Sequence, residues 1–413
     1  METKELFTFA LNLPEPWFIA DVDFIISEFD GEPELHITIL FEKGGQFTCP
    51  VEGCHEQMSA YDIKERTWRH LNFFQYRTYI HAQVPRVECK EHGVKTVSVP
   101  WARPGSGFTL LFENLIVQLG KQLSVSAIGR LLGETDTRLW RVIKFYVNKA
   151  REKADYSGVT AIGIDETSKK GHRYITVMVD LLKKIVLYVT DGKDSSTVER
   201  FCTDFQAHQG NPGEIRITTC DMSLGFKKGI EEHFPKAATV IDKFHVIKHA
   251  NEAVDEVRKE EVKHNEDLKR TKYLWLKNDR NLTDKQRIQK ETLMKKHLKT
   301  ARAYSMRLEL QDIYEHSSNR AEAEKRLAKL CGWMMRSRLE PMKKLCKMIR
   351  SHWTEILNYF NFRYTNAILE GMNSVIQNIK RRARGFRNPE YFKTIIYLTC
   401  GQLDVDSVID SFV

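Results

Sequence analysis

No stretch of this 413-residue sequence is apolar over the roughly 18 residues that a membrane-spanning helix requires. The amino-terminal residues METKELFTFALNLPEPW lack a basic region followed by a long apolar stretch, which argues against secretion. Internal repeats and low-complexity tracts are also absent. These absences predict a globular, cytoplasmic chain of about two to four domains.

Cysteine is scarce and unevenly placed, with eight residues in all. Three of them lie in the first quarter of the chain, and the other five are scattered through sequence of helical or strand character: Cys202, Cys220, Cys331, Cys346 and Cys400. This distribution is not a disulfide framework, and it fits a reducing compartment. The balance of 64 Lys and Arg against 55 Asp and Glu gives a net charge of +9, which is compatible with a nucleic-acid partner.

The hydrophobic pattern changes several times along the chain. Residues 1–48 alternate apolar and polar around the turn DGEP, which predicts a β-hairpin, and WARPGSG predicts a linker by its Pro and Gly content. Residues 109–153 have a helical period, and residues 161–242 alternate β-rich runs with helical segments. Residues 243–361 are almost wholly helical in pattern and contain no candidate strand. The middle of the chain therefore predicts an α/β sheet followed by a helical segment.

Two short pairs of metal-binding residue types occur near the amino terminus. CPVEGC supplies Cys49 and Cys54, and CKEH supplies Cys89 and His92. Tetrahedral zinc takes four N or S ligands, and Cys pairs in a cytosolic chain favour metal over small buried cysteines. We expect one structural zinc ion, since four protein ligands leave no open position for a substrate. Three other residues rival His92 as the fourth ligand: His55, His70 and His81.

LSVSAIGRLLGETDTRLWRVIKFYV reads as two helices joined at Gly133. Ser124 or Ser126 would cap the first helix and Thr135 or Asp136 the second. The inward faces would comprise Val125, Ile128, Leu131 and Leu132, then Leu139, Val142 and Ile143. A helix-turn-helix of this kind would present an outward face to the major groove of DNA, comprising Thr137, Arg138, Arg141 and Lys144. By spacing alone, an ordinary helical hairpin fits equally well.

Five runs predict core strands, four of which end in or contain an aspartate: AIGID, YITVMVD, KIVLYVT, IRITTCD and AATVID. With the helical segments between them, they give the order βββαβαβ of the ribonuclease-H-like fold. In that fold the first and fourth strands are neighbours, so Asp165 and Asp221 would meet at adjacent strand ends. Two facing carboxylates repel unless a cation lies between them, and magnesium prefers oxygen ligands. Any single aspartate could instead cap the next helix, as Asp221 and Asp242 easily could.

A third carboxylate is available in RYTNAILEGMNSVIQNIKRRARGFRN. As a helix, this stretch has an amide-rich polar face with a single acid, Glu370, among Asn366, Asn373, Ser374 and Gln377. It continues into a basic run with no acid: Lys380, Arg381, Arg382, Arg384 and Arg387. Such a run is usually a solvated face, but beside a metal site it could bind phosphates.

Taken together, these motifs resemble the bacterial insertion-sequence transposases of the IS-L-three group, within the DDE superfamily. The resemblance covers essentially the whole length, from the Cys/His region through GIDE, CDMSLGF and VIDKFHV to TNAILEGMNSVIQNIKRRARGF. It implies that Asp165, Asp221 and Glu370 form the catalytic triad and that residues 243–361 are a helical insertion before the glutamate. His92 stands where a fourth zinc-binding cysteine is often found.

The resemblance implies three domains: 1–105 with a β-hairpin and zinc site, 106–155 with the helix-turn-helix, and 156–413 with the ribonuclease-H-like catalytic core. It also implies Mg²⁺ or Mn²⁺, with two ions per active site, and hydrolysis at element ends followed by strand transfer. The partner would be double-stranded DNA, both element ends and target, bound by a homodimer or higher oligomer at the nucleoid. Two alternatives are a catalytically idle repressor derived from a transposase and a structure-selective nuclease.

Overall fold

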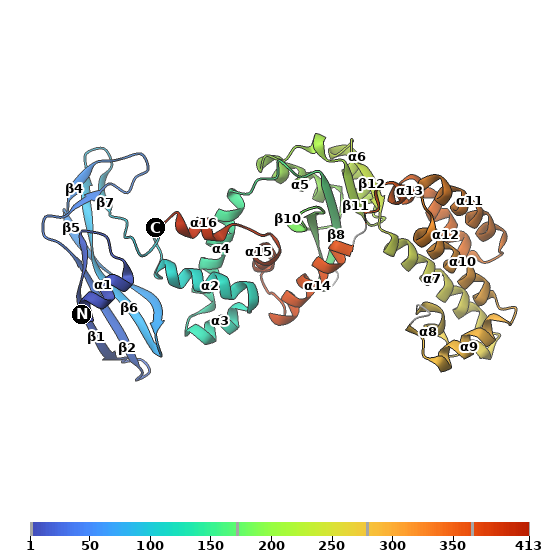
Figure 1. Ribbon diagram of the computed structural model, residues 1–413, viewed down its shortest axis with the longest axis horizontal. Coiled ribbons are helices and arrows are strands. Elements are labelled where there is room, and N and C mark those ends of the chain that lie inside the picture. The colour runs from blue at the N-terminus through green and yellow to red at the C-terminus, as the bar shows by residue number, and fades with distance from the viewer. Residues whose placement is uncertain (1–2, 171–172, 278–280, 365–366, 413) are drawn as a thin grey trace. The chain divides into compact units, whose positions relative to one another are not determined.

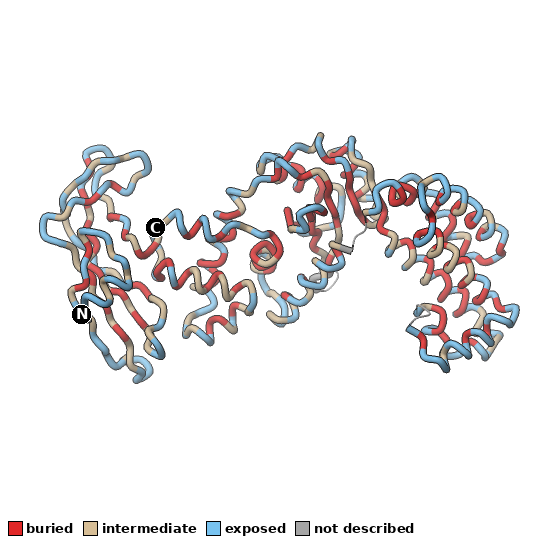
Figure 2. The backbone as a smooth tube through the Cα atoms, viewed as in Figure 1, coloured by how far each residue is buried: buried red, intermediate tan, exposed pale blue. Residues whose placement is uncertain are grey.

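The computed structural model describes residues 3–170, 173–277, 281–364 and 367–412 (Figure 1). The chain forms two compact units. Unit 1 comprises Met1–Lys153, Ile379–Thr399 and Leu403–Val413, and unit 2 comprises Ala154–Asn378 and Cys400–Gln402. Buried residues follow the strands of the sheet in each unit (Figure 2). No helix of the described ranges is long and apolar enough to cross a membrane.

The sheet of unit 1 has the strand order β1-β2-β6-β5, with β7 added alongside β6. The predicted hairpin is confirmed, since β1 and β2 pair antiparallel with Phe24 opposite Leu35. Side chains of β2 alternate, so that Leu35, Ile37 and Ile39 are buried on one face. A helix, α1, precedes the hairpin and was not predicted. The bounds are α1 Thr3–Leu11, β1 Trp17–Ile26, β2 Pro33–Phe41, β5 Asp62–Phe73, β6 Tyr76–Cys89 and β7 Gly93–Thr96.

The stretch WARPGSG is not the simple linker that its composition predicts. Trp101 is 8% exposed and packs edge-on against Trp17, with ring centroids 5.0 Å apart, and against Trp68 at 5.6 Å. Arg103 donates to the buried carboxylate of Glu113 at 2.8 Å. Aromatic burial therefore anchors this stretch to the core of the sheet, in spite of its Pro and Gly residues.

The helices of unit 1 include the predicted pair. The side chain of Ser124 accepts from Ala127 N and begins α3, and Gly133 ends it with a left-handed φ of +69°. Thr135 precedes α4, whose Leu139, Val142 and Ile143 are buried as expected. The bounds are α2 Leu110–Gln122, α3 Val125–Leu132, α4 Asp136–Glu152, α15 Pro389–Cys400 and α16 Val405–Asp410.

The prediction that Leu131 faces inward is wrong, because this side chain is 63% exposed. The buried stripe of α3 runs through Val125, Ile128 and Gly129. At 3.6 residues per turn, position 131 points roughly 100° away from the centre of that stripe.

The sheet of unit 2 has the order β10-β9-β8-β11-β12. The elements follow one another as predicted, and β8 and β11 are parallel neighbours, as expected for the first and fourth strands. Residues Ile162 and Ile164 pack into a core with α5 and α6. The bounds are β8 Ala161–Lys170, β9 Arg173–Asp180, β10 Ile185–Asp191, α5 Ser195–Ala207, β11 Ile217–Cys220, α6 Leu224–His233 and β12 Ala238–Ile241.

The first strand does not end at Asp165, as the apolar run predicted, but continues to Lys170. Its antiparallel pairing with β9 extends beyond Asp165, which lies opposite Val177, to the pair Lys170 and Arg173. Pairing with β11 ends earlier, at Gly163 opposite Thr219. Asp165 therefore lies within a long hairpin strand, just beyond the part that β11 covers.

The predicted helical segment is confirmed, and the described residues between 243 and 361 contain no strand. Its helices share one core, and α13 contacts the edge strand β12, where Asn358 Nδ2 donates to Thr239 O at 2.8 Å. This packing covers an edge that would otherwise expose unpaired backbone groups. The bounds are α7 Lys243–Glu261, α8 Lys272–Leu276, α9 Asp284–Met294, α10 Lys299–His316, α11 Arg320–Arg336, α12 Glu340–Ser351, α13 Trp353–Phe362 and α14 Ala367–Arg382.

Candidate functional site

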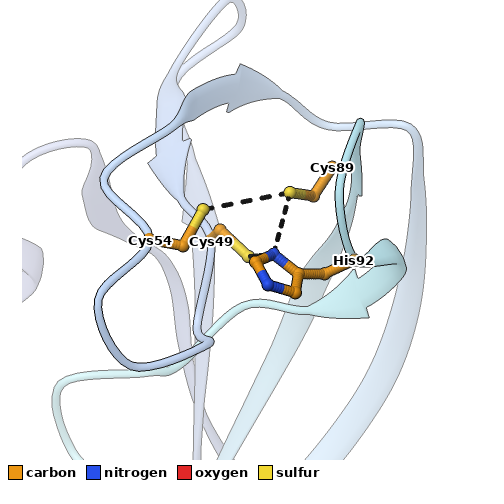
Figure 3. Close-up of side chains that lie close together, drawn as sticks. All are labelled: Cys49, Cys54, Cys89 and His92. Carbon is orange, nitrogen blue, oxygen red and sulfur yellow. Dashed lines mark hydrogen bonds between the residues drawn. The ribbon is translucent and has the colours of Figure 1, made fainter.

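Four potential metal ligands meet at one end of the unit 1 sheet: Cys49, Cys54, Cys89 and His92 (Figure 3). Their ligand atoms all lie within 4.8 Å of one another. His92 Nδ1 lies 3.3 Å from Cys89 Sγ and 3.7 Å from Cys49 Sγ, and Cys54 Sγ lies 3.9 Å from Cys89 Sγ. Three sulfurs and one imidazole nitrogen at this spacing fit a tetrahedral zinc ion.

Tight turns bring these ligands together. Cys49 follows β3 (Gln46–Thr48) and Cys54 precedes β4 (Gln57–Ser59), and Cys54 N donates to Val51 O at 3.0 Å between them. Gly53 allows this turn through its left-handed φ of +82°. Cys89 ends β6, and His92 lies in the turn before β7.

The three alternative fourth ligands lie elsewhere. His55 is exposed and does not belong to the cluster. His70 Nδ1 lies 2.9 Å from Thr109 Oγ1, and His81 stacks on His36 with a ring nitrogen separation of 2.7 Å. His92 is therefore the histidine that the structure brings to the three cysteines.

Three aspartates lie on adjacent strands of the unit 2 sheet or directly after them: Asp165 within β8, Asp221 after β11 and Asp242 after β12. Thr219 of β11 pairs with Gly163 of β8, and Cys220 pairs with Ile241 of β12. Continuing this register brings Asp165, Asp221 and Asp242 into one row, here called the acidic row. Parallel strands therefore gather the acids at one edge of the sheet.

Helix α14 packs directly on β8 beside this row. A Cβ at Gly163 would lie 2.8 Å from Leu369 Cδ1, so the close approach of the helix requires glycine there. Asn373 Nδ2 donates to Asp165 Oδ2 at 2.6 Å, and Gln377 Nε2 donates to Thr167 Oγ1 at 2.7 Å. The predicted amide-rich face thus holds the strand that carries Asp165. Asn366, predicted on the same face, lies outside the described residues.

Burial raises the pKa of Asp165, and the charges of Asp221 and Asp242 raise it further, against the opposing effects of Glu166 N–H and His245. Partial desolvation and Asp242 likewise raise the pKa of Glu370. The acids therefore share one electrostatic environment in which a cation would relieve repulsion. Among the described residues, however, only the Cys/His cluster gathers three or more such ligands closely enough to hold an ion, so the carboxylates stand farther apart.

Comparison with known proteins covers both sites. Residues 162–396 match the family model of the ISL3 DDE transposases, described as "Transposase". The chain belongs to this family. Residues 97–147 match the helix-turn-helix domain of transposase family ISL3, and residues 46–92 match the zinc-finger of transposase IS204/IS1001/IS1096/IS1165.

Two curated relatives extend the similarity over most of the chain. The transposase for insertion sequence element IS1557 of Mycobacterium tuberculosis is 27% identical over 437 residues, covering 97% of this chain and 96% of the relative. The transposase for insertion sequence element IS1001 of Bordetella parapertussis is 28% identical over 350 residues, covering 81% of this chain and 84% of the relative. The ISL3 zinc-finger, helix-turn-helix and DDE segments occur in that order in the chain.

The sequence indicates that Asp242 could cap the helix that follows it. Asp242 does cap α7, accepting from Phe244 N at 3.2 Å. It is also 1% exposed, and its Oδ2 has no hydrogen-bond partner within the described part of the chain. His245 Nδ1 lies 3.3 Å from that oxygen, an ion-pair distance. A buried carboxylate whose charge acts on Asp165 and Glu370 fits a cation-binding role, and only the fold reveals its burial.

The predicted DNA-contacting residues of α4 differ in their surroundings. Arg141 and Lys144 are exposed. Arg138 forms an ion pair with Glu134 at 2.5 Å, and its guanidinium carbon lies 4.1 Å from the centre of the Phe108 ring. Arg138 is thus held within the ISL3 helix-turn-helix segment, whereas the other two side chains are available to a partner.

Proposed function

We propose that this chain binds the terminal inverted repeats of an insertion sequence and catalyses metal-dependent DNA cleavage and strand transfer at the acidic row. The proposal rests on one observation: Asp165 lies in β8 and Asp221 directly after the neighbouring strand β11, beside the helix that supplies Glu370. The strand order β10-β9-β8-β11-β12 supports a ribonuclease-H-like core.

Each carboxylate has a distinct task in this proposal. Asp165 and Asp221 would hold the divalent cations, and Asn373 and the backbone N–H groups of Glu166 and Ser223 orient these two carboxylates. Glu370 is both a ligand and a local base that takes a proton from the attacking hydroxyl group. Two bound Mg²⁺ or Mn²⁺ ions would activate that hydroxyl and stabilise the leaving oxygen. The all-oxygen donor set suits these hard cations.

The rest of the proposal concerns the zinc ion, the DNA contacts, the domains and the assembly of the chain. We assign one structural zinc ion to Cys49, Cys54, Cys89 and His92, and DNA contacts to the exposed cations of α4 and of the basic run. The domain limits 1–105, 106–155 and 156–413 remain our division of the chain, although Ile379–Thr399 and Leu403–Val413 pack in unit 1. Assembly as a dimer or higher oligomer on DNA is part of the same proposal.

The test uses the purified chain and a labelled duplex that carries the inverted repeats flanking the coding region. Asp165→Asn, Asp221→Asn and Glu370→Gln should each abolish cleavage in Mg²⁺ or Mn²⁺ while binding in EDTA persists, because amides hold these ions weakly. Double variants should be scarcely worse than single ones, since the ligands act as a unit. Binding without cleavage by the unmodified chain would instead support the idle repressor.

The control must be an acid outside the row. Asp180 is a poor choice because it is 1% exposed and its Oδ1 accepts from Leu182 N at 2.7 Å and Lys183 N at 3.1 Å. Asp191→Asn at the exposed end of β10 is better and should cleave normally. Full cleavage by the Glu370→Gln protein would remove that residue from the site.

A further inference from the structure

The basic run after α14 packs with the helix-turn-helix in unit 1. We call residues 380–387 the basic segment. Arg382 Nη1 donates to Gln122 O at the end of α2. Beyond the segment, Tyr391 stacks face to face on Trp140 of α4, with ring centroids 4.0 Å apart and planes 5° apart. Phe386 lies 6.4 Å from the same Trp140 ring. These contacts fix the basic segment against the helix whose outward face is assigned to DNA.

A cavity of about 310 Å³ lies between the two elements. Ser124 and Ser126 at the start of α3 line it, together with Thr137 at the start of α4. Arg382 and Arg387 line it from the basic segment. Asp136 also lines it and is the one acid among the described residues that do so. The hydroxyl and guanidinium groups that border the hollow are of the types that contact DNA phosphates.

Exposed cations occur on both of the elements that line this cavity. Arg141 and Lys144 on α4 and Arg384 and Arg387 in the basic segment are exposed, and the described residues place no acid within ion-pair distance of them. Left-handed backbone at Arg384, with φ +54°, and at Gly385, with φ +94°, turns the chain sharply between α14 and α15. Exposed cations without ion-pair partners on two packed elements favour a polyanion that spans both.

We propose that the basic segment and α4 form one DNA-binding surface, in which α4 enters the major groove and Arg384 and Arg387 contact phosphates of the same duplex alongside it. This inference rests on the proposed function, which assigns end recognition to the helix-turn-helix. It replaces the expectation that the basic run binds phosphates beside the metal site.

The first experiment measures binding of the full chain to the inverted-repeat duplex in EDTA over a range of salt concentrations. The double variant Arg384→Ala/Arg387→Ala should lower the slope of log affinity against log salt by about 1.8, because each lost phosphate contact contributes about 0.9. The matched control Lys43→Ala/Lys95→Ala removes two cations from the part of unit 1 that carries the zinc cluster and should leave the slope unchanged. Circular dichroism and thermal melting check that both variants fold. An unchanged slope in the arginine variant, with wild-type folding, overturns the proposal.

The second experiment places a photo-crosslinking amino acid at position 384, at position 144 or at position 43 and maps the crosslinked nucleotides. Crosslinks from positions 384 and 144 should fall on the same duplex within about one helical turn, roughly 10 bp, of each other. Crosslinks from position 144 alone, or from position 384 to a separate duplex, overturn the shared surface and leave the proposed function standing. If neither position 384 nor position 144 crosslinks to DNA, and the chain binds the repeats no more tightly than a scrambled duplex, both the proposed function and the inference are rejected.

Discussion

Replacing Gly163 with alanine tests the packing that brings Glu370 to the acidic row. The new methyl group would lie 2.8 Å from both Leu181 Cδ2 and Leu369 Cδ1, and 3.1 Å from Leu369 Cγ. Leu181 is 2% and Leu369 1% exposed, so neither side chain can turn into solvent. The helix must therefore move away from β8. Overpacking of this kind costs about 1–3 kcal/mol of stability.

This displacement of α14 should also lower the rate of DNA cleavage. Glu370 follows Leu369 directly, and Asn373, one turn further on, donates to Asp165 Oδ2 at 2.6 Å. A shift of about 1 Å in a catalytic group can lower a rate by roughly 100-fold. We therefore expect Gly163→Ala to lose cleavage to about that extent while binding the repeats in EDTA as tightly as the unmodified chain.

Gly371→Ala is the matched control, because it adds the same methyl group to α14 next to Glu370. There the methyl would meet no heavy atom within 4 Å, and alanine should stabilise the exposed helix by about 0.5–1 kcal/mol. Hydrogen exchange by mass spectrometry would follow amides of β8 and α14, alongside the cleavage assay. Faster exchange and slower cleavage in Gly163→Ala alone support the reasoning. Equal behaviour of the two variants would refute it.

Three further predictions concern the zinc cluster, the buried His70 and the contact of Asn373 with β8. The purified chain should carry about one zinc ion. The Cys89→Ser variant should release it and unfold the sheet of unit 1, while hydrogen exchange in β8 stays unchanged. Elemental analysis that finds no zinc in a folded sample prepared with metal-free buffers would contradict this prediction. Burial and the neighbouring Arg69 lower the pKa of His70 to about 4. An unfolded histidine titrates near 6.5, so the unfolded chain binds more protons than the folded chain between pH 4 and pH 6.5. The contribution of neutral, buried His70 to the free energy of unfolding is therefore complete above pH 6.5. It is lost as the pH falls toward 4, by at most about 3 kcal/mol. Urea unfolding of the chain and of His70→Asn across that range would show it, and parallel curves would exclude it. Asn373→Ala should destabilise β8 by about 1–2 kcal/mol, and the exposed neighbour Ser374→Ala should not, as hydrogen exchange would report.

Local sequence patterns predicted the elements that carry the candidate sites. Short apolar runs identified the five strands of unit 2, because buried strands need consecutive or alternating apolar residues. Turn-forming residues beside Cys49 and Cys54 marked a ligand pair, because a tight turn can present two ligands with little backbone rearrangement. The strand order then predicted that Asp165 and Asp221 would be neighbours, and β8 and β11 are paired.

Features that depend on contacts between residues far apart in the chain could not be predicted from the sequence. The extension of β8 beyond Asp165 depends on its partner β9, and its polar residues carry no strand signal. The Pro and Gly residues around Trp101 predicted a linker, but Trp101 is buried against two other tryptophans, one from β1 and one from β5. The burial of Asp242 likewise follows from packing around the end of β12. A single sequence does not encode such contacts at the positions where they act.

The two candidate metal sites differ in how much the protein itself assembles them. In the Cys/His cluster, turns bring four ligand atoms within 4.8 Å, so that the backbone supplies most of the organisation. At the acidic row and the neighbouring Glu370, burial and, to a lesser extent, like charges raise the pKa of Asp165 and Glu370, and the carboxylates stand farther apart. Carboxylates that close around a cation would first have to overcome their mutual repulsion, so the cation would bind less tightly and could exchange with solvent ions. A site that must bind substrate and release product benefits from such adjustable ligands, whereas a site that only folds a small sheet benefits from a rigid one.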